Sequence, residues 1–170
     1  MSPQAFVITG PGLTNTITAM GQARADSVPM LVISGVNATP TLGKGFGFLH
    51  ELPDQRGMME KVALFSQRIT EAEELPGVLA RAFALLASSR PGPVHIEIPT
   101  DVMVKPADGI VALLSNAAPP APEAAAIAQA AKLCKTASRP LILAGGGAKW
   151  AEAPLRLLAE RLGAPVVETT

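Results

Sequence analysis

The chain has 170 residues, of which 48% are hydrophobic and 16% are charged. This composition supports a sizeable buried core and excludes a globally disordered chain. Lys and Arg together number 14, as do Asp and Glu, so no net charge favours nucleic acid or an anionic membrane as a partner. The length suits one ordinary domain, or part of one domain followed by the start of another.

Cysteine content and apolar segments bear on the compartment. Cys134 is the single cysteine, which excludes an internal disulfide and favours a reducing environment. Its Ala-rich helical surroundings predict a small buried core residue rather than a nucleophile. No apolar run reaches the roughly 18 residues of a membrane span, and the opening MSPQAF lacks the features of a signal peptide. We therefore predict a cytoplasmic protein.

The first hundred residues alternate short β-rich runs with helical patterns. Strands are predicted at 5–9, 29–34, 64–69 and 94–98. Helices are predicted at 13–24 and 75–86, the second with Thr70 as its cap, an acidic first turn and an apolar stripe at helical spacing. Nearly continuous apolar strands that alternate with helices predict a parallel α/β sheet covered on both faces.

Residues 105–122 are rich in Pro and Ala and lack periodic patterning, so they predict a linker between domain segments 1–104 and 123–170. In the second segment we predict helices at 123–136 and 151–162, strands at 140–144 and 164–168, and a glycine turn at 145–147. The chain stops as its second βαβ strand forms. We therefore expect that both ends cut through domains.

A Gly-Pro-Gly turn follows the first predicted strand. A strand, this turn and a helix place closely approachable backbone at the carboxyl edge of the sheet, where open α/β sheets bind ligands. The spacing is neither the GxGxxG fingerprint nor a P-loop. From the residues alone, a ligand site and a purely structural turn stay open.

Three motifs carry a family resemblance: TGPGLTNTITAMGQARADSVPMLVISG at 9–35, SSRPGPVHIEIPTDV at 88–102 and RPLILAGGGA at 139–148. They resemble thiamine diphosphate-dependent enzymes of the acetolactate synthase-like family. The resemblance implies the parallel-sheet thiamine diphosphate-binding fold, here the later part of the pyrimidine domain. The start of a Rossmann-like central domain would follow.

The resemblance also implies a cofactor site. Gly10, Pro11, Gly12 and Asn15 would line the aminopyrimidine of the cofactor, with a helix-start cap as the alternative role of Asn15. The activating glutamate and the motif for Mg²⁺ and the diphosphate would lie outside these residues. We expect the 170 residues alone to be inactive, and the full-length enzyme to be a homodimer or homotetramer that acts on a small 2-oxo acid.

The run LHELPDQ at 49–55 bears on the substrate. It matches the phenylalanine-glutamine-glutamate-threonine-proline run of acetolactate synthases only at Glu51 and Pro53, and Ala63 stands near a lysine typical of them. It is more similar to relatives that decarboxylate 5-guanidino-2-oxopentanoate. An acetolactate synthase fragment and a non-catalytic remnant remain alternatives.

This run supplies the candidate substrate-binding residues Glu51, Asp54 and Gln55. The carboxylates of Glu51 and Asp54 suit a guanidinium, and His50 is the candidate for proton transfer to the reacting carbon. The alternative is a solvated loop that caps the next helix, with Glu51 in a structural role.

His95 and the glycine run at 145–147 each have a simple structural role as an alternative to a ligand site. His95 lies in the predicted strand VHIEI, where we expect a hydrogen-bonded core histidine rather than a ligand, and the sequence gives no metal-site signal. Gly145, Gly146 and Gly147 either contact FAD, as this region does in some relatives, or form a turn without a ligand. A stand-alone Rossmann-like nucleotide binder is disfavoured because its second βαβ unit is unfinished.

Overall fold

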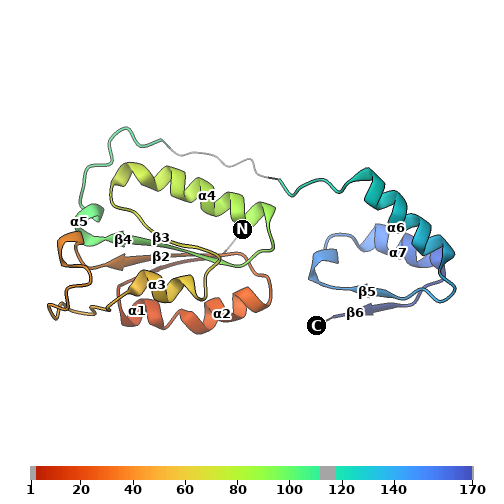
Figure 1. Ribbon diagram of the computed structural model, residues 1–170, viewed down its shortest axis with the longest axis horizontal. Helices are drawn as coiled ribbons and strands as arrows, with labels where there is room; N and C mark the ends of the chain where they lie inside the picture. The colour runs from red at the N-terminus through yellow and green to blue at the C-terminus, as the bar shows by residue number, and fades with distance from the viewer. Residues whose placement is uncertain (1–2, 112–117, 170) are drawn as a thin grey trace. The chain divides into compact units, whose positions relative to one another are not determined.

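A computed structural model describes residues 3–111 and 118–169 of the chain. The chain forms two compact units, Met1–Pro120 and Ala121–Thr170, here called unit 1 and unit 2 (Figure 1). The predicted linker at 105–122 includes residues 112–117, which lie outside the described residues. The domain limits 1–104 and 123–170 stay predictions.

Unit 1 contains a four-stranded parallel sheet, which confirms the predicted fold class. Its strands are β1 (Gln4–Val7), β2 (Met30–Val36), β3 (Ser66–Arg68) and β4 (Pro93–Pro99), in the order β1-β2-β4-β3. The α-helices of the unit are α1 (Pro11–Thr14), α2 (Ile17–Ala25), α3 (Gln55–Glu60), α4 (Leu75–Ser88) and α5 (Thr100–Met103). Helix α4 covers one face of the sheet, and α1, α2 and α3 cover the other (Figure 1).

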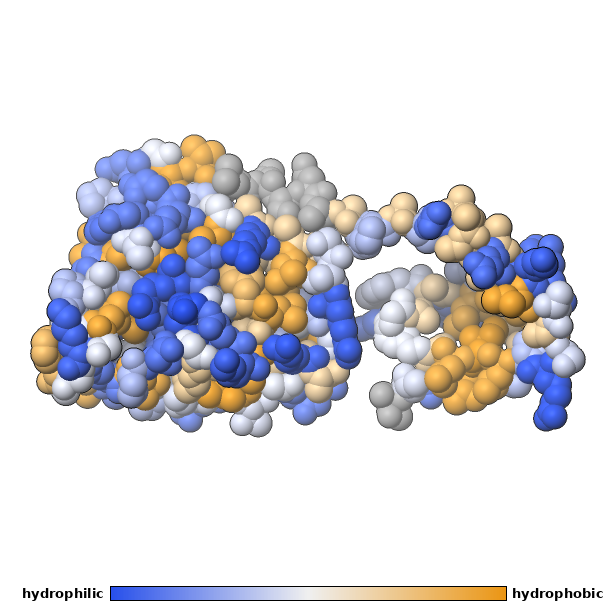
Figure 2. Space-filling model, viewed as in Figure 1, coloured by the Kyte–Doolittle hydropathy of each residue, from blue (hydrophilic) through white to orange (hydrophobic). Residues whose placement is uncertain are grey.

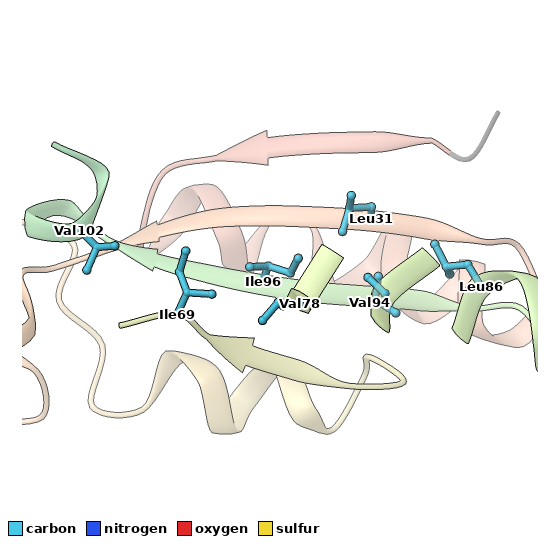
Figure 3. Packing of buried hydrophobic residues seen from close by; sticks show 8 residues of the cluster. Leu31, Ile69, Val78, Leu86, Val94, Ile96 and Val102 are labelled. Carbon is cyan, nitrogen blue, oxygen red and sulfur yellow. The ribbon is translucent and has the colours of Figure 1, made fainter. Parts of the chain in front are cut away.

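Strand β4 shows how the two faces differ. Val94 and Ile96 belong to the core cluster that also contains residues of α4, and Figure 3 shows them beside Val78 and Leu86. His95 and Glu97 alternate with them and therefore point to the opposite face, because successive strand residues face opposite sides. Both faces are buried, but only the α4 face is wholly apolar along this strand.

The opposite face has its own core cluster, made of residues from α1, α2, β2, α3 and the segment after α3. Its buried members are Leu13, Met20, Val32, Met59 and Ala63. Full burial of each large side chain stabilises the fold by about 1.5–3 kcal/mol. The cluster thus fixes the turn after β1 and helix α3 against the same sheet face.

The helix predicted at 13–24 is interrupted between α1 and α2. The Thr16 hydroxyl donates to the carbonyl of Leu13 at 2.7 Å, and the Thr16 N–H donates to the same carbonyl at 2.9 Å. Threonine side chains compete in this way with the helical hydrogen-bond ladder. The break separates the short turn helix α1 from the packed helix α2.

The cap predicted at Thr70 is also corrected by the structure. The Thr70 hydroxyl donates to the Glu74 carboxylate at 2.6 Å, and a 3₁₀ turn at Ala72–Glu74 precedes α4. Helix α4 begins at Leu75 without a side-chain cap, and Pro76 occupies its first turn. Proline suits that position because the first helical N–H groups have no partner within the helix.

Unit 2 consists of α6 (Ala124–Thr136), β5 (Ile142–Ala144), α7 (Glu152–Leu162) and β6 (Val166–Glu168). Strands β5 and β6 pair in parallel, as the βαβ pattern predicts. Cys134 is only half-buried, which corrects the expectation of a core residue, because the described part of unit 2 buries no residue of α6. Figure 2 shows apolar side chains at the surface of this unit.

No helix among the described residues is long and apolar enough to cross a membrane.

Candidate functional site

The candidate site lies at the carboxyl edge of the unit 1 sheet. The Gly10–Gly12 turn follows β1, and the 37–54 segment follows β2 and leads into α3. Because all four strands are parallel, their carboxyl ends meet at one edge. Segments that are 40 residues apart in the sequence can therefore meet there.

Gly10 brings the turn and the 49–55 run together. Its backbone has φ 63° and ψ −119°, a conformation that residues with a side chain rarely adopt. A Cβ added at Gly10 would lie 2.5 Å from the carbonyl oxygen of His50 and 2.7 Å from the His50 Cβ. Glycine is thus required both by conformation and by the close approach of His50.

His50 carries the unpartnered polar atom of the site. Its Nδ1 is buried and has no hydrogen-bond partner among the described residues. Its backbone adopts φ 62°, an uncommon conformation for a residue with a side chain. A buried polar atom without a partner is costly, so each one in a folded protein calls for an explanation. His50 therefore places such an atom next to the glycine turn.

The two carboxylates of the run hold local backbone. Glu51 accepts hydrogen bonds from the N–H groups of Gly45, Gly47 and Phe48 at 2.9, 2.8 and 3.0 Å. Asp54 is the N-cap of α3 and accepts the Gly57 N–H at 2.9 Å. This is the loop-and-cap arrangement given above as the alternative, and a role of either carboxylate in substrate binding stays a prediction.

Gln55 lies inside the protein rather than at its surface. It is 2% exposed, and its amide oxygen accepts the Thr9 hydroxyl at 2.8 Å and the Gly10 N–H at 2.9 Å. Its amide nitrogen donates to Glu97 Oε2 and to the Gly35 carbonyl, both at 2.9 Å. The structure leaves Gln55 no exposed surface for a substrate, because its whole amide group is bonded beneath the turn.

His95 is a hydrogen-bonded core histidine, as predicted. It is fully buried, with Nε2 2.8 Å from the Ser34 hydroxyl and Nδ1 2.7 Å from the Ser66 hydroxyl. Burial lowers the pKa of His95 from 6.5 to about 4, because the charged form loses its hydration. The ring is therefore neutral at physiological pH.

Glu97 and Arg68 were missed at the sequence level. Glu97 is fully buried, and its Oε1 accepts the Arg68 Nε at 2.5 Å. The glutamate in VHIEI was a signal for this pair, since a charged residue in a strand buried on both faces needs a partner. The sequence alone does not show that the partner comes from β3.

The other predicted cofactor contacts lie at the surface of the turn. Pro11 and Asn15 are exposed, and Gly12 is half-buried. Asn15 ends α1 through its backbone N–H, so its proposed alternative role as a helix-start cap is not observed. The turn thus exposes Pro11 and Asn15, and Gly10 is the residue of the turn that lies against His50.

Unit 2 has a groove of about 580 Å³ at the glycine turn. Gly145 and Gly146 line it, and Gly147 is exposed nearby in the 3₁₀ turn Gly146–Ala148. The charged side chains that line the groove are Lys149, Glu152, Arg156, Glu160 and Glu168. Within residues 3–111 and 118–169, no cluster of three or more His, Cys, Asp or Glu side chains could hold a metal ion.

Comparison with known proteins decides the family. Residues 3–60 match the thiamine pyrophosphate enzyme N-terminal TPP binding domain, and residues 127–170 match the central domain of the same enzymes. The chain belongs to the thiamine pyrophosphate enzymes. This confirms the resemblance inferred from the three motifs, and the first match includes both the glycine turn and the 49–55 run.

Individual relatives agree with this family assignment. The chain is 49% identical over 163 residues to a Pseudomonas aeruginosa protein named as a probable 2-ketoarginine decarboxylase, AruI, covering 95% of this chain and 29% of that protein. It is 37% identical over 163 residues to the Escherichia coli acetolactate synthase isozyme 1 large subunit, covering 95% of this chain and 28% of the relative. The chain therefore spans less than a third of the length of these relatives.

A solved structure agrees with the fold. A Mycobacterium smegmatis protein described as thiamin diphosphate-dependent superimposes with a TM-score of 0.84 at 27% identity. The match covers 98% of this chain and 32% of that one. The sheet edge described above therefore belongs to a thiamine pyrophosphate enzyme fold.

Proposed function

We propose that this chain forms part of a thiamine diphosphate-dependent 2-oxo acid decarboxylase that acts on 5-guanidino-2-oxopentanoate. The observation that carries the proposal is the difference in identity over the same span. The chain is 49% identical to the 2-ketoarginine decarboxylase relative and 37% identical to the E. coli acetolactate synthase. The run LHELPDQ, in which His50 precedes Glu51, favours the same substrate over pyruvate.

The residues present fit the pyrimidine end of the cofactor. The turn exposes Pro11 and Asn15 to an incoming ring, and His50 Nδ1 is a buried polar atom without a partner among the described residues. When bound, thiamine diphosphate supplies the electron sink for decarboxylation of a 2-oxo acid. Gly10, Pro11, Gly12 and Asn15 would hold its aminopyrimidine, and Mg²⁺ would be bound outside the described residues.

His50 and the two carboxylates have distinct proposed roles. His50 would hold or move a proton beside the reacting carbon, since an imidazole has one ring nitrogen that can accept a proton and one that can donate. Glu51 and Asp54 keep lone pairs beyond their backbone bonds, and a guanidinium can share a carboxylate that already accepts N–H groups. Gln55 would act beneath the turn rather than on the substrate.

The test is an assay of the full-length enzyme on the two 2-oxo acids. We expect thiamine diphosphate- and Mg²⁺-dependent CO₂ release from 5-guanidino-2-oxopentanoate, with a higher kcat/KM than for pyruvate. Glu51→Ala should raise KM for the guanidino substrate more than KM for pyruvate, because only the former carries the cation. Fast acetolactate formation from pyruvate would contradict the proposal in favour of an acetolactate synthase.

The proposed decarboxylase activity does not depend on whether FAD binds in unit 2 or on the oligomeric state of the full-length enzyme. The groove at Gly145 and Gly146 carries three carboxylates and two cations, a balance that does not favour a diphosphate. Flavin absorbance of the purified full-length enzyme would show whether FAD binds there. We propose a homodimer or homotetramer by family resemblance, which light scattering would measure.

A further inference from the structure

Gln55 connects the glycine turn to the interior of unit 1. It is the first residue of α3, and its amide oxygen accepts the Gly10 N–H and the Thr9 hydroxyl. At 2% exposure it has no surface for a substrate or cofactor. Any effect of Gln55 on the site must therefore pass through the turn that it holds.

The neighbours of Gln55 dictate which way its amide lies. Its nitrogen donates to Glu97 Oε2 and to the Gly35 carbonyl at 2.9 Å each. Both of these groups only accept, whereas the Gly10 N–H only donates. A flipped amide would place a donor against the Gly10 N–H and an acceptor against the carboxylate. One orientation alone satisfies Gly10, Gly35 and Glu97 together.

Glu97 is fixed in turn by Arg68. The Glu97 carboxylate is fully buried, and Arg68 Nε donates to its other oxygen at 2.5 Å. A buried carboxylate is stable only when it has a charge partner and hydrogen bonds. Arg68 lies on β3 and Glu97 on β4, and Gln55 carries the connection to the turn after β1. The series Arg68–Glu97–Gln55–Gly10 therefore crosses the sheet.

The hydrogen bond from the Gly10 N–H to the Gln55 amide oxygen also bears on the position of His50. The Gly10 backbone lies so close to His50 that a Cβ at Gly10 would be 2.5 Å from the His50 carbonyl oxygen. Loss of the Gln55 acceptor would release the Gly10 N–H and move this contact. Gln55 thus supports the turn directly and supports His50 through the turn.

From these contacts we infer that Gln55 is a positioning residue for the pyrimidine-binding turn, and that the Arg68–Glu97 pair sets its orientation. The inference rests on the proposed function, since it assumes that the turn holds the aminopyrimidine. It moves Gln55 from the group of candidate substrate ligands to a supporting role.

The test compares two ligands on the full-length enzyme and its Gln55→Glu variant. The variant places a second carboxylate against Glu97 and the Gly35 carbonyl. Isothermal titration with Mg²⁺ would measure the Kd of thiamine diphosphate and of inorganic diphosphate, which lacks the pyrimidine. We expect the Kd of thiamine diphosphate to rise by roughly tenfold or more. We expect the Kd of inorganic diphosphate to stay within about twofold.

Two further variants make the result specific. Gln22→Glu is a matched control, because Gln22 Nε2 also donates to a carboxylate, that of Asp26, but at an exposed site on α2. We expect no change in either Kd for this control. The double variant Gln55→Glu, Glu97→Gln restores an amide–carboxylate pair beneath the turn, but it leaves the Gly35 carbonyl without its donor and Arg68 without its carboxylate partner. It should therefore regain part of the thiamine diphosphate affinity, and its fold if Gln55→Glu alone does not fold.

The outcomes separate the two proposals. Failure of the unmodified enzyme to bind thiamine diphosphate would overturn the proposed function. With binding intact, an unchanged Kd in Gln55→Glu would overturn the positioning role. An equal loss of affinity for both ligands, or a double variant no better than the single one, would also overturn it.

Discussion

At the scale of single residues, the site depends on polar side chains buried between the sheet and α3. Thr9, Ser34, Gln55, His95 and Glu97 are all buried, and each has a hydrogen-bond partner. Such groups stabilise a fold only while every partner is in place, because an unmade bond leaves a desolvated polar atom. This dependence makes single substitutions informative.

Because the buried His95 resists protonation, the free energy of unfolding should fall in acid. Its pKa is about 4 in the folded protein and 6.5 when exposed, so below pH 6.5 the unfolded chain binds a proton that the folded chain does not. The free energy of unfolding should be unaffected by His95 above pH 6.5. It should then fall by about 3 kcal/mol as the pH drops to about 4.

Urea unfolding at a series of pH values would measure this loss, with His95→Gln as the comparison. The variant cannot take up the proton, so its stability should depend less on pH over that window. A parallel pH dependence in both proteins would contradict the assignment to His95.

Gly10→Ala should destabilise unit 1 by about 3 kcal/mol. An alanine would be strained at φ 63°, and its Cβ would collide with the His50 backbone. Gly21→Ala is the matched control in helix α2, where a Cβ has no neighbour within 4 Å. That change should stabilise by about 0.5–1 kcal/mol. Thermal unfolding followed by circular dichroism would measure both, and equal effects would show that the Gly10 contact does not matter.

At the scale of elements, the loop before α3 is organised by one side chain. Gly43, Gly45 and Gly47 all have positive φ values, and the Glu51 carboxylate gathers the N–H groups of Gly45, Gly47 and Phe48. A carboxylate is the side chain that can accept so many donors at once. The loop's conformation therefore depends on Glu51 whatever its role toward the substrate.

Glu51→Gln should loosen this loop, because the amide keeps one acceptor and presents its NH₂ to backbone donors. Hydrogen exchange at Gly45, Gly47 and Phe48 should accelerate by roughly tenfold. Glu60→Gln is the control, since Glu60 pairs with Arg56 at an exposed site on α3. Unchanged exchange in Glu51→Gln would show that the three bonds do not hold the loop.

At the scale of the whole molecule, unit 2 exposes apolar side chains to an unusual degree. Leu141, Leu143 and Trp150 are 62, 67 and 90% exposed, and β6 is exposed along its length. Exposed apolar surface of this kind marks an interaction site or a tendency to aggregate. In the relatives, which are more than three times as long as the matched span, other segments are available to cover it.

The 170-residue chain by itself should therefore bind a hydrophobic dye and self-associate, as size-exclusion chromatography would show. Leu143→Lys should reduce both effects, because it places a charge on the exposed side of β5. The matched change Leu157→Lys on α7 tests whether the effect is specific to the strand face. A dye-free monomer would contradict the prediction.

Much of the molecule could be predicted from the sequence. The strands, the parallel sheet and the family follow from local signals: apolar runs, glycine turns and three contiguous motifs. The exact limits of the helices could not be predicted from these signals. Thr16 donates to the Leu13 carbonyl and Thr70 to the Glu74 carboxylate, and hydrophobic periodicity does not reveal such hydrogen bonds. The limits of helix α3 were not predicted either, since its six residues carry too short a pattern.

The fold class, the family and the place of the glycine turn could all be read from patterns in the amino-acid sequence. The contacts of the residues around that turn became visible only in the folded chain. Gln55 was grouped with Glu51 and Asp54 because they are neighbours in the chain, yet it lies beneath Gly10 and bonds to Glu97, 42 residues away. Local patterns encode elements, whereas a buried polar network is set by which strand ends meet, and that depends on the packing of the whole sheet.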